Sequence, residues 1–221
     1  MHIFVAEDEK TIRRELTILL ENAMYQVTAP ENFENIPDWI TEASPDLILL
    51  DVNLPGMSGF DICTSLRQRE NTCPVIFLTS RTDSMDELNG MLRGGDDYIT
   101  KPYNPTILLL RIQAILKRTE TNATGSGSYR DIAVNPGKGV LDSGQIQMIL
   151  TKNEMLIFMT LLQHQGQIVS RDELMTRLWD NSEYISDNAL TVNISRLRTK
   201  LAEMGYADAI ETRKKQGYVL I

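Results

Sequence analysis

Cysteine is scarce in this chain of 221 residues, which has only Cys63 and Cys73, with no His or Cys ligand pattern beside them. We therefore expect neither a disulfide framework nor a zinc site, and a reducing compartment suits the two thiols. No apolar run approaches the roughly 20 residues of a membrane span. The N-terminal MHIFVAEDEK lacks the basic and apolar regions of an export signal. These absences predict a cytoplasmic protein that contacts no membrane.

Positive charge is also in deficit, since 22 basic against 30 acidic residues give a net charge of −8. Most of the acidic excess falls in residues 1–118, whereas residues 190–221 hold six basic and three acidic residues. An acidic total can hide a local nucleic-acid footprint. Residues 119–128, TETNATGSGS, contain no large apolar side chain and predict a flexible linker. We therefore expect domains over 1–118 and 129–221, both of ordinary size.

The first domain has the pattern of an α/β fold. The apolar runs HIFVA, QVTA, LILLD, VIFLTS and DYITKP alternate with segments whose apolar residues have helical spacing. Strands that are apolar on both faces are typical of a parallel sheet covered by helices. The pattern predicts a doubly wound, five-stranded parallel sheet with its site at the carboxyl ends of the strands.

The second domain has a different pattern. Short strands with Gly and Asn-Pro turns come first, and TKNE at Thr151 and SRDE at Ser170 then match the capping box that opens a helix. A third helix is predicted from about Asp187 to Met204, and ETRKKQGYVLI closes the chain as a hairpin. Three helices followed by a hairpin predict an α+β winged helix-turn-helix domain.

Polar side chains end four of the predicted strands. Glu7 and Asp8 end the first strand, Asp51 the third, Thr79 the fourth and Lys101 the fifth. Three crowded carboxylates repel one another, and Mg²⁺, which prefers oxygen ligands and keeps positions for water and phosphate, would relieve that repulsion. Lys101 and Thr79 would then bind the oxygens of a phosphoryl group, with Asp51 as the nucleophile.

The strand-end sequences AEDE, LLDVNLPGMSGFD, FLTSR and GGDDYITKPY resemble the flavodoxin-like receiver domain of bacterial two-component response regulators. The resemblance implies that a sensor histidine kinase phosphorylates Asp51. It also implies that the main-chain carbonyl of Asn53 is a Mg²⁺ ligand alongside Glu7, Asp8 and Asp51. A cis bond before Pro102 and a switch pair of Thr79 and Tyr98 are implied as well.

Two other functions are compatible with parts of this pattern. An aspartyl-phosphate phosphatase of the haloacid dehalogenase type would resemble Asp-x-Asp-x-Thr, whereas Asp51 is followed by Val52-Asn53-Leu54-Pro55, without the second acid. A transcription factor that never uses phosphate would have no need of Lys101 and Thr79. We therefore expect no enzyme beyond self-phosphorylation from a phosphohistidine donor and autodephosphorylation.

The third helix of the second domain is amphipathic on a helical wheel. Leu190, Ile194, Leu197 and Leu201 share one face, which predicts the core side. The opposite face is predicted to be exposed and to read DNA, with Arg196 placed to bind guanine. Its members are Ala189, Val192, Asn193, Arg196 and Lys200.

LTKNEMLIFMTLL, IVSRDELMTRLW, NALTVNISRLRTKL and IETRKKQGYVLI resemble the OmpR/PhoB winged-helix family. The resemblance implies binding to double-stranded promoter DNA, a phosphate contact by Arg198, and contact with RNA polymerase by residues 179–188. Arg213 lies in the wing, where Lys214 and Lys215 replace the usual Arg-Gly or Val-Gly. We expect these wing cations to contact DNA at some cost in turn geometry.

The family also implies a homodimer that forms on phosphorylation. Asp96, Asp97, Arg111 and Arg118 match its ion pairs, but Glu87 and Ile107 replace a usual Lys–Glu pair. We therefore expect a weakened dimer. The altered face and YISDNALTVNISRLR resemble most the branch that senses bacitracin and cationic antimicrobial peptides in low-GC Gram-positive bacteria.

Overall fold

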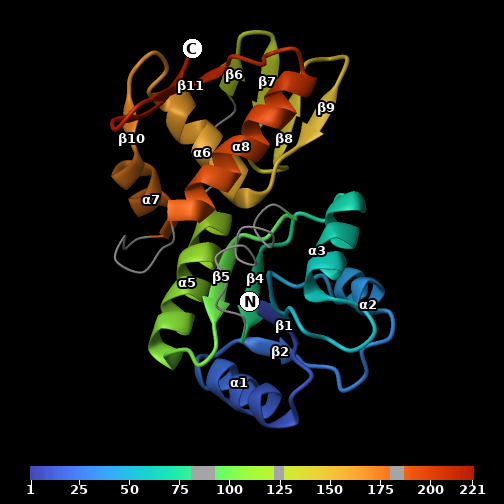
Figure 1. The fold of residues 1–221 in the computed structure, drawn as a ribbon. Helices are drawn as coiled ribbons and strands as arrows, with labels where there is room; N and C mark the ends of the chain where they lie inside the picture. Colours follow the sequence, from blue (N-terminus) through green and yellow to red (C-terminus); the bar gives the residue numbers. More distant parts are fainter. Residues whose placement is uncertain (81–92, 122–126, 180–186) are drawn as a thin grey trace. The chain divides into compact units, whose positions relative to one another are not determined.

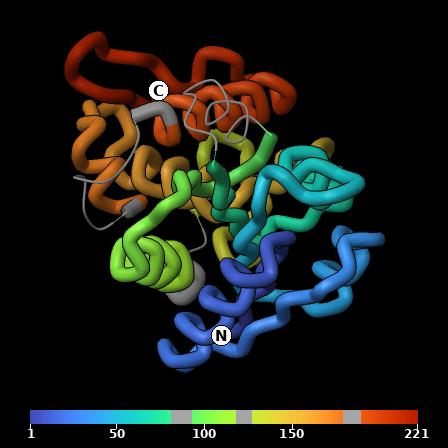
Figure 2. The backbone as a smooth tube through the Cα atoms, turned by 60° about the horizontal axis from the view of Figure 1, so that its bottom comes forward, coloured from blue at the N-terminus to red at the C-terminus, as the bar shows by residue number. Residues whose placement is uncertain are grey.

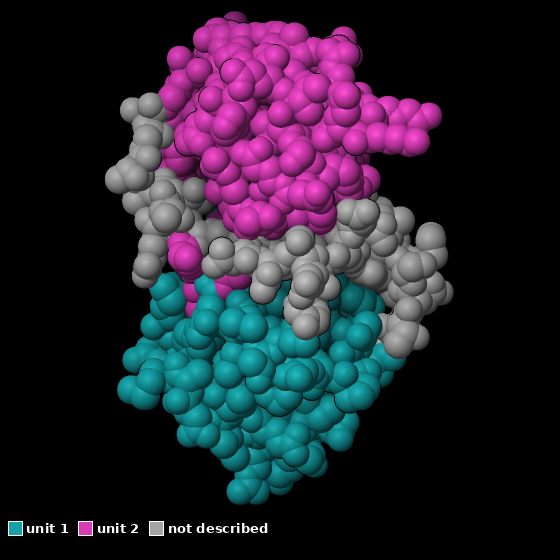
Figure 3. All heavy atoms as spheres, turned by 90° about the vertical axis from the view of Figure 1, so that its left-hand side faces the viewer, with its two compact units in different colours: residues 1–113 teal, residues 114–221 magenta. Residues whose placement is uncertain are grey.

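The computed structural model describes residues 1–80, 93–121, 127–179 and 187–221. The chain forms two compact units, residues 1–113 and 114–221 (Figure 3). Helix α5 (Pro105–Thr121) includes the first residues of the predicted linker, and strand β6 (Gly127–Tyr129) includes its last residues. A flexible connection between domains therefore stays a prediction for the residues between them.

The first unit contains the predicted parallel sheet, with strands in the order β2-β1-β3-β4-β5. All four pairings are parallel, which confirms the doubly wound topology. The strands are β1 (His2–Ala6), β2 (Gln26–Thr28), β3 (Leu47–Asp51), β4 (Val75–Thr79) and β5 (Asp97–Thr100). Among the described residues, the helices that begin in this unit are α1 (Lys10–Asn22), α2 (Ile36–Ala43), α3 (Gly59–Gln68) and α5.

Helices cover both faces of this sheet, as strands buried on two sides require (Figure 1). Every residue of β3 and β4 is buried. On one face, α2 and α3 lie side by side (Figures 1 and 2), and Phe60 of α3 meets Phe77 of β4 edge to face, with ring centroids 5.1 Å apart. On α1, Arg13 is buried, as are Leu16 and Leu20, whereas Ile12 and Leu19 of the same helix are only half-buried.

The second unit has the predicted winged-helix architecture. A four-stranded antiparallel sheet, β6-β7-β8-β9, precedes three helices and a sheet of order β10-β12-β11. Thr151 and Glu154 form both hydrogen bonds of the capping box at α6, and Ser170 Oγ accepts from the Glu173 amide. Besides β6, the elements are β7 (Ile132–Asn135), β8 (Val140–Asp142), β9 (Gln147–Ile149), α6 (Lys152–Gln163), β10 (Val169–Ser170), α7 (Arg171–Trp179), α8 (Asp187–Glu203), β11 (Ile210–Arg213) and β12 (Gly217–Leu220).

A membrane-crossing helix is not found in the part of the chain that the structure describes, because none of its helices is both long and apolar enough.

Candidate functional sites

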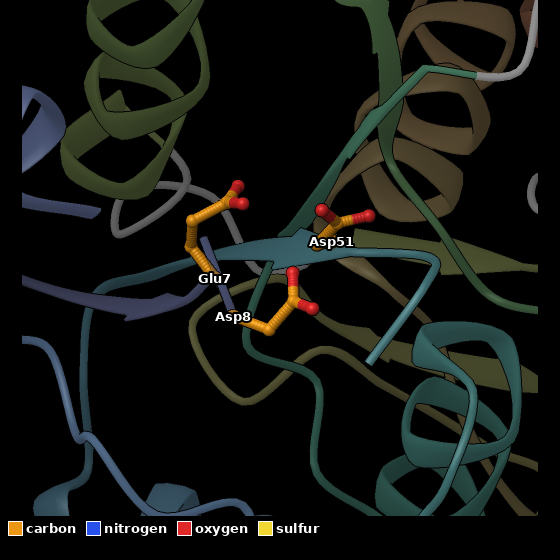
Figure 4. A group of neighbouring side chains, drawn as sticks. All are labelled: Glu7, Asp8 and Asp51. Carbon is orange, nitrogen blue, oxygen red and sulfur yellow. The ribbon is translucent and has the colours of Figure 1, made fainter. Parts of the chain in front are cut away.

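The acidic side chains predicted to converge do so at the carboxyl edge of the first sheet. Glu7 and Asp8 follow β1, Asp51 ends β3, and β1 and β3 are neighbours. One carboxylate oxygen of each residue lies within 4.8 Å of the others. Glu7 and Asp51 are buried and Asp8 is exposed, so the cluster opens to solvent on one side. Figure 4 shows the three side chains near one another at the ends of their strands.

Lys101, which follows β5, joins this cluster. Its Nζ lies 2.6 Å from Glu7 Oε2 and 2.6 Å from Asp51 Oδ2. Burial would lower the pKa of Lys101, but hydrogen bonds to Asp51 and Glu7 raise it above its ordinary value. Burial raises the pKa of Glu7, and the charge of Asp51 adds to that rise while Lys101 opposes it. The lysine is therefore a fully charged ammonium shared by two acids.

Two residues that the sequence patterns did not single out hold the acids in place. Arg13 donates to the main-chain carbonyls of Glu7 at 2.8 Å and Asp8 at 3.1 Å. Gly59 begins α3 directly beneath Asp51, where an added Cβ would lie 2.2 Å from the Asp51 carbonyl oxygen. Only glycine allows so close an approach of helix and strand. A buried arginine and a helical glycine have no distinctive sequence pattern.

Asp51 is oriented from its own loop as well. The amide of Asn53 donates to Asp51 Oδ1 at 2.8 Å, while Oδ2 accepts from Lys101. The peptide bond between Lys101 and Pro102 is cis, as predicted. Thr79 is buried at the end of β4, and its carbonyl accepts from the amide of Lys101 at 2.7 Å. Asp51 and Lys101 thus meet at one edge, and Thr79 ends the strand between them.

A cavity of about 560 Å³ opens over this edge. Tyr103, Glu15 and Ser80 line it, and none of them was predicted. Burial has the largest effect on Tyr103, and the negative charges of Glu7, Glu15 and Asp51 add to it. Together they raise the pKa of Tyr103 to about 12, so its phenol stays protonated. The cavity has room for a phosphoryl group between Asp51 and solvent.

The donor set fits Mg²⁺. Three carboxylates within reach of one point, two buried and one exposed, supply hard oxygen ligands and leave one side open for water. No sulfur or imidazole group competes among the residues of this cluster, which is what a preference for Mg²⁺ over softer metals requires.

Tyr98 is part of the core and only 8% exposed. This is the residue that the resemblance pairs with Thr79 as a switch, and its side chain lies inward in this structure. Its neighbours in sequence, Asp96 and Asp97, are buried in ion pairs within the chain, to Arg67 at 3.1 Å and to Arg111 at 2.8 Å. These acids are therefore engaged inside the unit before any partner arrives.

The predicted dimer face also includes part of α5. Ile107 is half-buried on α5, and Leu110, one turn along, is 56% exposed. Glu87 and the side chain of Arg118 lie outside the described residues, as does most of the segment predicted to contact RNA polymerase.

The prediction of the exposed face of α8 is wrong. Val192 is 2% exposed and Asn193 is fully buried, with its amide donating to the Ala189 carbonyl at 2.9 Å. Arg196 and Lys200 both form ion pairs with the buried Glu154 of α6, at 2.9 and 2.7 Å. The wheel failed because α6 packs against one flank of the apolar stripe, the flank that carries Asn193, Arg196 and Lys200, and leaves the other flank exposed.

The exposed strip of α8 instead runs along Thr191, Ser195, Thr199 and Ala202, with Arg198 half-buried at its edge. Arg198 donates to the Ile210 carbonyl and to Thr212 Oγ1, and so joins α8 to β11.

Arg171, at the start of α7, completes this surface and was not predicted. It donates to the hydroxyl of Tyr218 and to Thr191, and the guanidinium groups of Arg171 and Arg198 both lie over the Tyr218 ring. Arg213, Lys214 and Lys215 are exposed in the wing. Lys215 has φ of 62°, a left-handed conformation that agrees with the expected cost in turn geometry.

Both halves of the chain match known families. Residues 3–113 match the response regulator receiver domain, and residues 145–220 match the C-terminal domain of transcriptional regulatory proteins. The chain is 38% identical to the response regulator protein GraR of Staphylococcus haemolyticus and 37% identical to that of Staphylococcus aureus, in each case over 99% of both proteins.

Solved structures agree. A mutant of RitR has a TM-score of 0.82 and 25% identity, covering 100% of this chain and 98% of that one. The response regulator DrrB of Thermotoga maritima, described as an OmpR/PhoB homologue, has a TM-score of 0.52 and 28% identity, covering 99% and 98%.

Proposed function

Because the chain belongs to the DNA-binding two-component response regulators that join a receiver domain to an OmpR/PhoB-type winged helix, we propose that it is phosphorylated on Asp51 by a sensor histidine kinase in the cytoplasm. The observation that carries the proposal is the shared Lys101 between Asp51 and Glu7, 2.6 Å from each. A lysine in that position can pair with the Asp51 carboxylate before phosphorylation and with the phosphoryl oxygens after it.

Asp51 Oδ2, which faces Lys101, is the proposed nucleophile. It forms a bond to the phosphorus of the phosphohistidine, whose imidazole leaves with the electron pair of the P–N bond. Mg²⁺ held by Glu7, Asp8, Asp51 and the Asn53 carbonyl would neutralise charge on the transferred group. Lys101 then pairs with the phosphoryl oxygens, and the Thr79 hydroxyl donates to one of them. Arg13 and Gly59 hold the acids and the Asp51 backbone still during this step.

The proposed output is a homodimer that binds promoter DNA and contacts RNA polymerase through residues 179–188. Since Asp97 and Arg111 already pair within the chain, we expect dimerisation to require exchange of such pairs between protomers, together with burial of Leu110. This exchange, and the missing Lys–Glu pair at Glu87 and Ile107, would weaken the dimer.

For DNA we propose the exposed strip of α8 in place of the buried face first predicted. Ser195 and Thr199 offer hydroxyls to base edges, while Arg171 and Arg198 flank the strip with positive charge. Arg213, Lys214 and Lys215 extend the charge into the wing, where they would meet phosphates or the minor groove. A response to bacitracin or cationic antimicrobial peptides is the physiological part of the proposal, supported by the full-length match to GraR.

One experiment tests the phosphorylation. The chain is incubated with phosphoramidate, with Mg²⁺ or with EDTA, and its intact mass is measured. We expect one phosphoryl group with Mg²⁺, none with EDTA and none on Asp51→Asn. A phosphoryl group retained on Asp51→Asn would move the nucleophile elsewhere, and labelling in EDTA would remove the metal from the proposal.

A further inference from the structure

Glu154 is a fully buried carboxylate at the start of α6, and three polar groups converge on it, one from the cap of its own helix and two from α8. Its Oε2 accepts from the Thr151 amide at 2.8 Å and from Lys200 Nζ at 2.7 Å. Its Oε1 forms the ion pair with Arg196 Nε at 2.9 Å. Lys200 Nζ also donates to the Ile149 carbonyl at 2.7 Å, so the same cluster reaches β9.

This carboxylate is charged despite its burial. Burial opposes ionisation, but Arg196 and Lys200 outweigh it and hold the pKa of Glu154 below its ordinary value. Buried ion pairs add little net stability over well-packed apolar side chains, because desolvation offsets their attraction. What they do supply is direction. The charge-assisted hydrogen bond from Lys200 Nζ to Oε2 fixes the geometry of the two groups more narrowly than an apolar contact does. Arg196 Nε, 2.9 Å from Oε1, adds charge attraction without hydrogen-bond geometry.

The direction matters because Arg196 and Lys200 lie one turn apart on the same side of α8. One carboxylate therefore holds α8 at two points against rotation about its own axis. Arg198 holds the other edge through the Ile210 carbonyl at 2.9 Å and Thr212 Oγ1 at 2.8 Å. Adjacent residues of a helix are about 100° apart, so even a partial rotation would carry Ser195 and Thr199 away from the outward direction.

We propose that Glu154 is a positioning residue for sequence recognition, which sets the rotation of α8 through Arg196 and Lys200 so that the Thr191–Ser195–Thr199 strip faces the bases. This inference rests on the proposed DNA contact by that strip. Arg196 and Lys200 act through Glu154 and do not touch DNA.

The test measures discrimination. The probes are the tightest duplex that the phosphodonor-treated wild-type chain selects from a randomised double-stranded pool, and a scrambled duplex of the same composition. We expect Glu154→Gln to reduce the affinity ratio about tenfold, mainly by weakening the selected duplex. The salt slope should stay the same, because no phosphate contact is lost. Glu173→Gln, which breaks the exposed Glu173–Arg177 pair in the same domain, is the matched control and should change neither quantity.

A double-mutant cycle separates positioning from direct contact. Arg196→Met should reduce discrimination in the wild-type background and have less than about a twofold further effect on Glu154→Gln, because both changes break one interaction. Effects that multiply independently, or a salt slope lowered by about one in Arg196→Met, would show a direct DNA contact and overturn the proposal.

A second variant tests the same inference if Glu154→Gln unfolds the domain. The triple change to methionine at Glu154, Arg196 and Lys200 replaces the buried ions with apolar groups of similar length and should keep the domain folded. We expect its melting temperature to stay near that of wild type while its affinity ratio falls about tenfold. Discrimination equal to wild type in the folded triple variant would overturn the inference.

The same titrations separate this failure from failure of the proposed DNA surface. Ser195→Arg should abolish preference for the selected duplex if the strip reads bases. If Ser195→Arg loses preference and Glu154→Gln keeps it, only the positioning role is wrong. If Ser195→Arg keeps full preference, the proposed surface itself is wrong.

Discussion

Removal of the ammonium group of Lys101 should destabilise the receiver domain and make its stability depend on Mg²⁺. In Lys101→Met, Glu7 and Asp51 lose the cation between them, although their side chains are only 1% and 6% exposed. Removing one partner of a buried ion pair lowers the free energy of unfolding by about 3–5 kcal/mol. Since Lys101 itself is 13% exposed and water reaches the open side of the cluster, we expect the lower end, about 3 kcal/mol.

Divalent cation should restore much of this loss. A ligand at a hundred times its Kd stabilises the folded state by about 2.7 kcal/mol. Mg²⁺ should bind Lys101→Met more tightly than wild type, because no ammonium competes for the carboxylates. The gain in stability on adding Mg²⁺ should therefore be larger in the variant.

The measurement is urea unfolding of the full chain in EDTA and in saturating MgCl₂, followed at the receiver transition. Arg69→Met, which breaks the exposed Arg69–Asp38 pair, is the control and should cost under about 1 kcal/mol in both buffers. If Lys101→Met in EDTA is as stable as wild type, or if Mg²⁺ stabilises both proteins equally, the shared-lysine account is refuted.

Four further outcomes are expected. Glu154→Gln should cost about 3 kcal/mol at neutral pH. The folded pKa of Glu154 is lowered, so its stabilisation is present above the unfolded pKa and is lost as pH falls through the folded value. Urea unfolding at pH 7 and pH 3.5 should show the difference from wild type shrinking, and a constant difference would contradict a charged Glu154. Gly59→Ala places a Cβ 2.2 Å from the Asp51 carbonyl oxygen and should slow labelling by phosphoramidate at least tenfold, whereas a wild-type rate would mean that α3 shifts without moving Asp51. Lys215→Gly relieves a φ of 62°; it should stabilise the domain by about 1 kcal/mol and lower the DNA salt slope by about one, and an unchanged slope would remove Lys215 from the DNA surface. Leu110→Glu should abolish the rise in dimer fraction that a phosphodonor causes in sedimentation, and a persisting rise would place the dimer on another face.

The parallel sheet and the polar residues at the ends of its strands were predicted from the sequence, whereas the order of the strands was not. Apolar runs such as LILLD and VIFLT are typical of strands buried on both faces, so they predict a covered parallel sheet before any contact is known. In that topology the ends of neighbouring strands share one edge, and Asp51, Thr79 and Lys101 had to meet there. Their proposed chemistry follows from residue type, from chain order and from the resemblance to receiver domains.

Tertiary structure alone decided which side of α8 faces outward. A helical wheel measures the periodicity of one helix, and it located Leu190, Ile194, Leu197 and Leu201 in the core correctly. It cannot show how many neighbours a helix has. Because α6 adds a second contact surface that contains a buried carboxylate, charged residues could be placed inside, and Arg196 and Lys200 are held there by Glu154.

The same limit explains Arg13 and Gly59. An arginine on an amphipathic helix is normally solvated. Arg13 is buried because its guanidinium donates hydrogen bonds to two main-chain carbonyls of the loop after β1. Gly59 is required by a backbone 2.2 Å from where its Cβ would stand. Local sequence records the propensity and charge of each residue, whereas the burial of a polar group depends on partners distant in the chain, and those partners exist only once the chain has folded.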